Sequence, residues 1–146
     1  MKPHIKLAET KTPDGGIMSL FEHDGDYSIS LDGAEIMHSR ASASEELLGQ
    51  LGVERLDRDV ENRVLVGGLG LGCTLRTALK FSSDKTIVEV AELLPQMEEW
   101  NRIHMQSLNG ALVDDPRVEI RKQNVSNLIR KAKPGTYDAI MLDVDN

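Results

Sequence analysis

Apolar and polar side chains alternate along residues 27–31, which is the pattern of a strand with one buried face. Two Asp-Gly pairs, at residues 24–25 and 32–33, flank this run. Asp-Gly favours a tight hairpin turn because glycine readily adopts a positive φ. Residues 5–39 are therefore predicted to form a small antiparallel sheet.

A helix is predicted to follow this sheet. Ser42 and Glu45 have the spacing of a capping box, which satisfies two free N–H groups at a helix start. Gly52 is predicted to end the helix, and the polar residues 54–62 are interpreted as a linker. The apolar positions of this helix are Leu47, Leu48 and Leu51.

The pattern changes at residue 64, where short apolar runs begin to alternate with helical segments. The predicted strands are residues 64–66, 86–91, 118–120 and 137–142. Three helices are predicted between these strands. One follows a glycine-rich loop at residues 67–72, one begins at Pro95, and one spans residues 125–131. Such alternation favours a parallel sheet with right-handed crossovers. We therefore predict an α/β fold, a Rossmann-like doubly wound parallel sheet preceded by a small antiparallel β-domain, with the division at residues 1–60 and 61–146.

Composition restricts the partners. The net charge is −7 and no basic stripe is present, so nucleic acid is not expected as a ligand. One cysteine excludes an internal disulfide and fits a reducing compartment. No apolar stretch approaches the length of a membrane span and no signal peptide is recognised, so we expect a soluble cytoplasmic protein without membrane partners.

The glycine loop is the strongest local signal for chemistry. Gly68, Gly70 and Gly72 follow a strand and precede a helix, which allows a ligand to approach the backbone closely. The helix behind the loop offers free N–H groups and the positive end of its dipole, which suit a carboxylate or phosphate. Alone, such a loop is weak evidence for a nucleotide site.

Two acidic residues strengthen this interpretation. Glu92 ends the second predicted strand, 20 residues after Gly72, where a carboxylate can accept hydrogen bonds from both ribose hydroxyls. Asp143 ends the fourth strand and faces the same crevice. Glu92 could instead be a solvated residue at a helix N-terminus, and Asp143 a turn residue, but together with the loop they favour a nucleotide site.

The remaining chemically active residues carry weaker signals. Cys73 opens the helix behind the loop, where the helix dipole could lower its pKa, although packing under the loop is the commoner role. Trp100 is predicted to lie in the core. The four histidines show no ligand spacing, so no metal is expected; they are His4, His23, His38 and His104.

Four segments together resemble the spermidine synthase-like branch of the class I methyltransferase fold. They are residues 64–76 (VLVGGLGLGCTLR), 92–95 (ELLP), 115–119 (DPRVE) and 137–146 (YDAIMLDVDN). The resemblance implies that Glu92 binds the ribose of a sulfonium nucleoside and that Asp143 orients or deprotonates an attacking amine. It implies S-adenosylmethionine, decarboxylated S-adenosylmethionine or methylthioadenosine as the ligand.

The chain departs from that family mainly on the polyamine side. The loop lacks the family's acidic residue, which holds the amine of the decarboxylated donor. The family's acid at the adenine side is Asn124 here, which can still accept a hydrogen bond, and the acid three residues after Asp143 is Asn146. The family's glutamine and Tyr-His pair have no counterpart; Ile36, Met37, Glu45 and Glu46 occupy that region.

Three functions follow as hypotheses. The first is an S-adenosylmethionine-dependent transferase in which Asp143 positions an unknown small acceptor such as an amine. In this hypothesis the carboxylate-bearing donor is preferred. The second is aminopropyl transfer from decarboxylated S-adenosylmethionine, with the missing acids supplied elsewhere. The third is a non-catalytic nucleoside-binding or oligomerising module, because the chain stops after four of the fold's seven strands and is interpreted as truncated.

The fourth predicted strand suggests self-association. Residues 139–142 are apolar without alternation, as in a strand covered on both faces. Nothing that follows in this chain pairs with the strand, and no lysine or proline protects it from pairing with another chain. We therefore expect a homo-oligomer formed through this strand.

Overall fold

The computed structural model describes residues 3–143, so the position of Asn146 lies outside the described residues. Four strands form an antiparallel sheet in the order β1-β2-β3-β4. Their bounds are β1 Ile5–Lys11, β2 Ile17–His23, β3 Asp26–Leu31 and β4 Ala34–His38. Asp24 and Asp32 adopt positive φ angles beside Gly25 and Gly33, which confirms the two Asp-Gly hairpin turns.

The second half of the chain forms a parallel sheet in the order β7-β6-β5-β8. Its strands are β5 Asn62–Gly67, β6 Thr86–Ala91, β7 Val118–Arg121 and β8 Ala139–Leu142. The predicted α/β fold class, with an antiparallel sheet before a parallel one, is therefore confirmed. β8 begins two residues later than predicted, because Asp138 instead exchanges hydrogen bonds with the backbone of Arg63.

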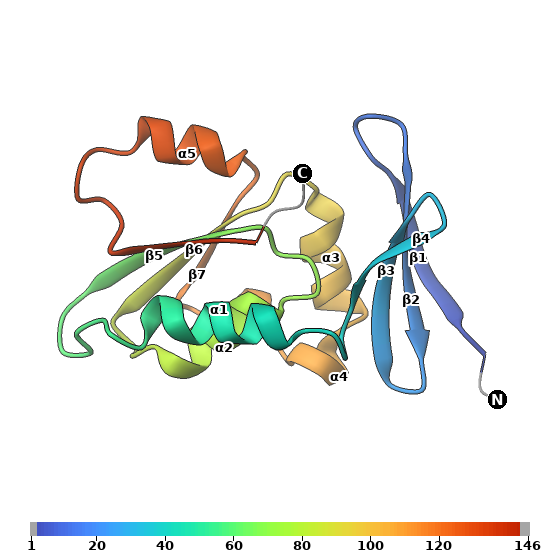
Figure 1. The fold of residues 1–146 in the computed structure, drawn as a ribbon, viewed down its shortest axis with the longest axis horizontal. Helices are drawn as coiled ribbons and strands as arrows, with labels where there is room; N and C mark the ends of the chain where they lie inside the picture. The colour runs from blue at the N-terminus through green and yellow to red at the C-terminus, as the bar shows by residue number, and fades with distance from the viewer. Residues whose placement is uncertain (1–2, 144–146) are drawn as a thin grey trace.

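The helices cover both faces of the parallel sheet (Figure 1). The helix α5 lies on one face, opposite α1 and α2. Their bounds are α1 Ala43–Val53, α2 Cys73–Phe81, α3 Pro95–Ile103, α4 Gln106–Asn109 and α5 Val125–Lys131, with a 3₁₀ turn at Leu112–Asp114. Apolar residues of β5, β6 and α2 form the fully buried centre, including Val64, Val66, Val88, Val90 and Leu75. Among the described residues, no helix is long and apolar enough to cross a membrane.

The helix α1 differs from its prediction at both ends. Ser42 does precede the helix, but its side chain makes no capping bond; its hydroxyl donates to the carbonyl of Ser39 instead. The helix continues through Gly52 to Val53. Gly52 is needed for packing, because a Cβ there would lie 2.2 Å from Sδ of Met141 on β8. The glycine therefore lets α1 approach the parallel sheet closely.

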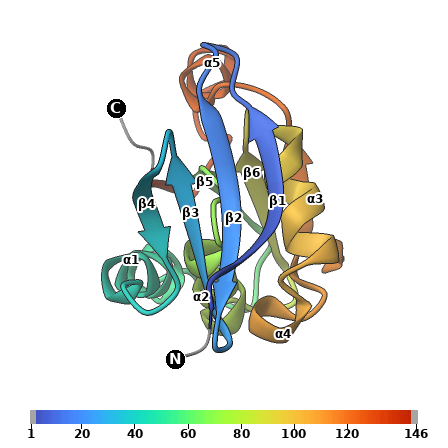
Figure 2. The same cartoon turned by 90° about the vertical axis from the view of Figure 1, so that its right-hand side faces the viewer.

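The helix α1 packs against α2 and β8 rather than against the antiparallel sheet. The division of the chain at residue 60 stays a prediction, but in space this helix lies with the parallel sheet. The antiparallel sheet stands across the carboxyl ends of the parallel strands, with β1 on the side of α3 and β4 on the side of α1 (Figures 1 and 2). A hydrogen bond of 2.7 Å between the hydroxyls of Tyr27 and Ser107 joins β3 to α4.

Candidate functional site

A cleft of about 810 Å³ lies where the antiparallel sheet faces the carboxyl ends of the parallel strands. This volume is in the range of small-molecule sites. One wall is formed by the glycine loop and the residues after β6 and β7, and the other by β4 and the start of α1. A smaller depression of about 440 Å³ between the end of α2 and residues 109–117 contains none of the predicted site residues.

Gly68 and Gly70 of the glycine loop line one wall of the cleft, whereas Gly72 is not among the lining residues. Gly68, Gly70 and Gly72 all have positive φ angles, of 93°, 49° and 81°, a backbone conformation that other residues rarely adopt. The N–H of Gly72 closes a turn by donating to the carbonyl of Leu69 at 2.8 Å. Met37 of β4 lies directly over the loop, since a Cβ on Gly70 would come within 2.8 Å of its Sδ.

Glu92 lies in this cleft and is bound to the loop. One carboxylate oxygen accepts from the N–H of Leu69 at 3.0 Å, and the other accepts from the N–H of Leu94 at 3.1 Å. The sequence pattern did not indicate these two bonds. They fix the carboxylate beside the loop, at the carboxyl end of β6 where it was predicted.

Asp143 also lines the cleft, from the end of β8. Its carboxylate accepts from the hydroxyl of Thr74, the second residue of α2, at 3.2 Å. Its own N–H donates to the carbonyl of Gly67 at 3.1 Å. The structure thus brings Asp143, Glu92 and the glycine loop to one cleft.

Asn124 lines the same cleft and has a role that the sequence analysis missed. Its side-chain oxygen accepts from the N–H of Ser126 at 2.8 Å and so caps the N-terminus of α5. The Asn-x-Ser spacing before the predicted helix was a usable signal for this cap. An amide oxygen has two lone pairs, so the cap leaves Asn124 able to accept a second hydrogen bond.

The residues that line the cleft give it a negative charge. Four of them carry carboxylates, and no lysine or arginine of the described chain is among them. The carboxylates belong to Glu35, Glu45, Glu92 and Asp143. Glu35 comes from β4 and Glu45 from the first turn of α1, so the second wall supplies acids that the glycine loop lacks.

The surroundings of Cys73 disfavour its thiolate form. It is buried at the start of α2, and this burial raises the pKa of its thiol. The nearby Glu45 and Glu46 act in the same direction, while Arg76 and a hydrogen bond with Ser42 oppose them. Desolvation therefore outweighs any lowering of this pKa by the helix dipole. The burial of Cys73 supports the commoner of its two predicted roles, small packing under the loop.

Trp100 is buried in α3, as predicted. Leu93, next to Glu92, is 56% exposed and lines the cleft. An exposed apolar side chain in a cleft suits the flat face of a base.

No group of three or more His, Cys, Asp or Glu residues in the described chain is arranged to hold a metal ion.

Comparison with curated proteins gives a partial match. No protein-family model matches the chain. A polyamine aminopropyltransferase of Prochlorococcus marinus (strain MIT 9313) is 31% identical over 81 residues, which are 56% of this chain and 28% of that protein. A second polyamine aminopropyltransferase, from another strain of the same organism, is 28% identical over 82 residues.

Comparison with solved structures covers almost the whole chain. A spermidine synthase from Thermotoga maritima superposes with a TM-score of 0.75 at 25% identity, over 97% of this chain and 47% of that structure. A spermidine synthase in complex with the transition state analogue AdoDATO superposes with a TM-score of 0.74 at 24% identity, again over 47% of that structure. The chain thus spans about half the length of these structures.

Proposed function

Because the chain has a spermidine synthase-like fold over about half the length of such enzymes, we propose that its cleft binds the adenosyl donor of an aminopropyltransferase-type reaction. The observation that carries this proposal is the negatively charged cleft in which Glu92 is hydrogen-bonded to the glycine loop. The likeness to a polyamine aminopropyltransferase over 81 residues supports the same assignment.

The nucleoside would occupy the wall formed by the loop and the residues after β6. A carboxylate has about four acceptor positions, and Glu92 uses two of them for backbone N–H groups. The others can accept the two ribose hydroxyls. Leu93 would pack against the base, and Asn124 would accept a hydrogen bond from the adenine amino group.

The charge of the cleft supports the decarboxylated donor. The sequence favoured S-adenosylmethionine because the loop has no acid. Glu35 and Glu45, however, line the opposite wall, where a donor carboxylate would be repelled and a donor amine attracted. The decarboxylated donor carries a sulfonium and an ammonium and no carboxylate. We therefore place aminopropyl transfer ahead of methyl transfer.

In this reaction the protein acts mainly by positioning the donor and the acceptor. The nitrogen of an amine acceptor attacks the propyl carbon bonded to sulfur, the C–S bond breaks, and its electron pair stays on sulfur. Neutral methylthioadenosine leaves, and the new ammonium loses a proton to a carboxylate, for which Asp143 is proposed. Holding donor and acceptor in line supplies most of the acceleration, and the carboxylate supplies the base.

Methyl transfer from S-adenosylmethionine is the second candidate. It is favoured by the N-terminus of α2 behind the loop, because helix N–H groups and the dipole suit the carboxylate of that donor. In this case the same Glu92 would bind the ribose, and only the end of the donor tail would be held differently.

Competition binding tests the proposal. In this experiment, S-adenosylmethionine and its decarboxylated form are each used, separately, to displace methylthioadenosine from the protein. We expect the decarboxylated donor to bind at least about tenfold more tightly, equivalent to about 1.4 kcal/mol. An equal or opposite preference contradicts aminopropyl transfer and supports the second candidate. Failure of all three ligands to bind contradicts both.

A further inference from the structure

Two asparagines lie under the glycine loop, on the side away from the cleft. Asn101 of α3 is 1% exposed, and its amide nitrogen donates to the carbonyls of Gly70 at 2.9 Å and Met97 at 2.8 Å. Asn109, the last residue of α4, donates to the carbonyl of Leu71 at 2.8 Å and to Oδ1 of Asn101 at 3.0 Å. Two successive loop carbonyls are therefore held by side-chain amides.

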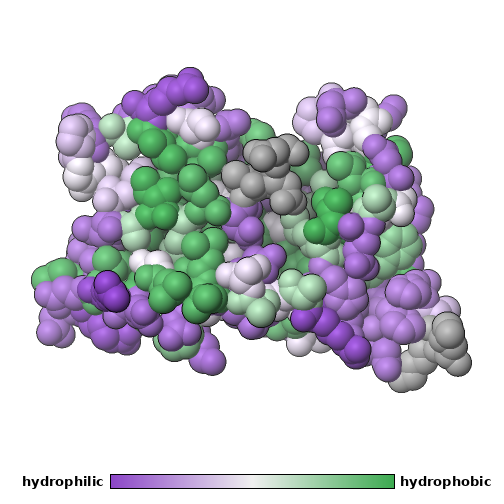
Figure 3. Space-filling model, in the orientation of Figure 1, coloured by the Kyte–Doolittle hydropathy of each residue, from purple (hydrophilic) through white to green (hydrophobic). Residues whose placement is uncertain are grey.

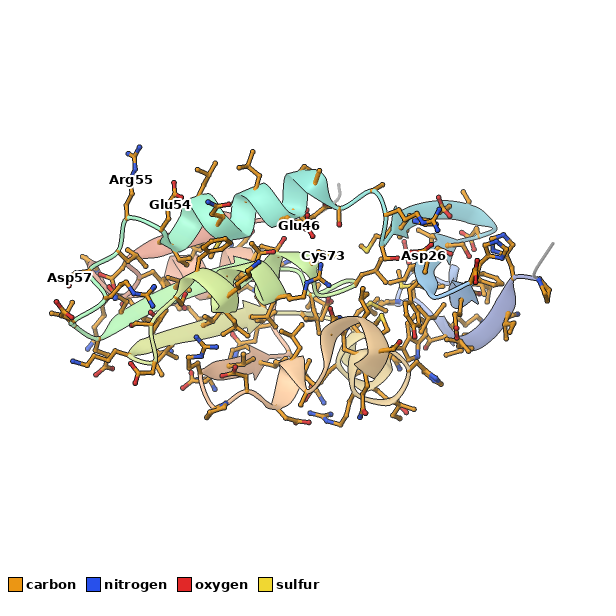
Figure 4. The ribbon with its side chains drawn as sticks, turned by 90° about the horizontal axis from the view of Figure 1, so that it is seen from below. Asp26, Glu46, Glu54, Arg55, Asp57 and Cys73 are labelled. Carbon is orange, nitrogen blue, oxygen red and sulfur yellow. The ribbon has the colours of Figure 1, made fainter. Side chains whose placement is uncertain are left out.

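The network continues to the surface of the molecule. Arg76 of α2 donates to Oδ1 of Asn109 at 2.8 Å and to the carboxylate of Glu46 at 3.2 Å. Figure 4 labels Glu46 on α1, near the end of α2 that carries Cys73. Both amide groups thus use both donors and their oxygen. Complete satisfaction offsets the cost of burying such polar groups.

We propose that Asn101 and Asn109 are positioning residues that hold the glycine loop in its ligand-binding conformation. This inference rests on the proposed function of the cleft. Neither residue lines the cleft, so both act through the loop. The function of the network is to fix the direction of two loop peptide groups.

Peptide geometry gives the mechanism. In a planar trans peptide the C=O and N–H groups point in opposite directions. Because Asn101 holds the carbonyl of Gly70, the N–H of Leu71 is directed away from the core, toward the cleft that Gly70 and Leu71 line. Without the amides, the glycine-rich backbone would have many alternative conformations, since glycine loses more freedom on ordering than any other residue.

Close packing at Gly72 gives independent support. A Cβ on Gly72 would lie 2.8 Å from Nδ2 of Asn109 and 2.9 Å from Oδ1 of Asn101. The backbone of the loop thus rests directly on both amides. A leucine at position 101 would fill the core of α3 as well, but it could not donate to the loop.

The test compares three alanine substitutions. Asn62 provides a matched control, because it is also a buried asparagine, 5% exposed, whose amide donates to two carbonyls, those of Asp57 and Val60. Those carbonyls belong to a connection outside the cleft. We expect Asn62→Ala, Asn101→Ala and Asn109→Ala all to lower the unfolding temperature. Only the last two are expected to weaken methylthioadenosine binding, by about tenfold or more.

A purely structural role predicts a different result. If Asn101→Ala is folded and binds methylthioadenosine within about twofold of the unchanged protein, the proposal is wrong. Asn109 is only partly buried, so Asn109→Ala decides the question if Asn101→Ala does not fold.

A second measurement needs no ligand. Amide hydrogen exchange across residues 68–72 should become faster in Asn101→Ala and Asn109→Ala and stay unchanged in Asn62→Ala. Unchanged exchange in all three variants contradicts the inference. If the unchanged protein binds no methylthioadenosine but the exchange differs as expected, the proposed function fails while the positioning role stands.

Discussion

The two walls of the cleft differ in how firmly their side chains are held. On the loop wall, Glu92 is fixed by two backbone N–H groups, and the loop itself rests on Asn101 and Asn109. On the opposite wall, Glu35 is exposed on β4, and Glu45 is partly exposed on the first turn of α1. We infer that a preorganised wall receives the constant nucleoside and an adaptable wall receives the variable tail and acceptor.

The largest expected effect on stability and on ligand binding comes from a substitution in the glycine loop. In Gly72→Ala the new Cβ must fit a left-handed backbone, which costs about 1–2 kcal/mol. It must also displace two amides and Leu112, all within 2.9 Å, which adds roughly 1–3 kcal/mol. We expect a strongly destabilised protein without measurable methylthioadenosine binding, as judged by thermal unfolding and calorimetry.

Gly135→Ala is the control for that substitution. Gly135 has a similar φ of 79° but nothing within 4 Å of an added Cβ, so only the backbone strain should appear. If both variants lose the same stability and Gly72→Ala still binds the nucleoside, the loop wall is less rigid than we infer.

Glu92→Ala should have the next largest effect. It removes the proposed acceptor of both ribose hydroxyls and releases the N–H groups of Leu69 and Leu94. We expect the fold to persist and methylthioadenosine binding to weaken by roughly 1–3 kcal/mol. Glu99→Ala, an exposed change on α3, should leave the affinity unchanged. Calorimetry that gives Glu92→Ala the affinity of the unchanged protein removes Glu92 from the site.

Much of the loop wall could be predicted because its signals are local. A glycine loop between strand and helix, and an acid at a strand end, follow each other along the chain. The bounds of β6 and α5 agree with the apolar runs that predicted them. The support of the loop could not be predicted, because Asn101 on a helix has the pattern of a solvated residue.

The opposite wall could not be predicted for a different reason. Glu35 reaches the cleft because the antiparallel sheet stands against the parallel one, with Met37 over Gly70. Glu45 reaches it because α1 packs against α2 and β8. No local sequence rule fixes that packing. The capping-box interpretation of Ser42 failed for a local reason, because its hydroxyl donates to the carbonyl of Ser39, three residues earlier in the chain.

The strand β8, which carries Asp143 at its end, gives a third prediction. Ile140 is 44% and Leu142 is 53% exposed. Figure 3 shows apolar surface in the region where β8, α1 and α5 face the viewer. We therefore keep the prediction that copies associate through β8, and that Ile140→Lys shifts the protein toward monomer by placing a charge there. Light scattering of a stable monomer at high concentration without the substitution would contradict this.

The smallest expected effect is on the free energy of unfolding and concerns the ion pair between Asp115 and Arg117. Asp115 accepts hydrogen bonds from the backbone and guanidinium of Arg117, which also donates to the carbonyl of Leu79 in α2. The Arg117 hydrogen bonds lower the pKa of the Asp115 carboxyl. The ion pair therefore stabilises the folded protein fully at pH values above about 3.9, the pKa of an aspartate in the unfolded chain. This stabilisation is lost as the pH falls through the lower pKa of Asp115 in the folded protein.

Asp115→Asn should accordingly cost about 1 kcal/mol at neutral pH. Denaturant unfolding of both proteins at a series of pH values should show this difference shrinking in acid. A difference that stays constant down to the acid limit would mean that the ion pair contributes nothing to folding. Methylthioadenosine affinity at neutral pH should not change, because neither residue lines the cleft.

The division of labour between the two walls is tested most directly by titrating two ligands into three variants. The ligands are methylthioadenosine, which has no charged tail, and decarboxylated S-adenosylmethionine. The variants are Glu92→Ala, Glu45→Gln and the control Glu54→Gln, at the far end of α1 from the cleft (Figure 4).

We predict that Glu92→Ala weakens both ligands by a similar factor of about tenfold. Glu45→Gln should weaken only the decarboxylated donor, also by about tenfold, and leave methylthioadenosine within about twofold. Glu54→Gln should change neither affinity. If Glu45→Gln affects both ligands equally, or neither, the two walls do not have separate roles and the account is wrong.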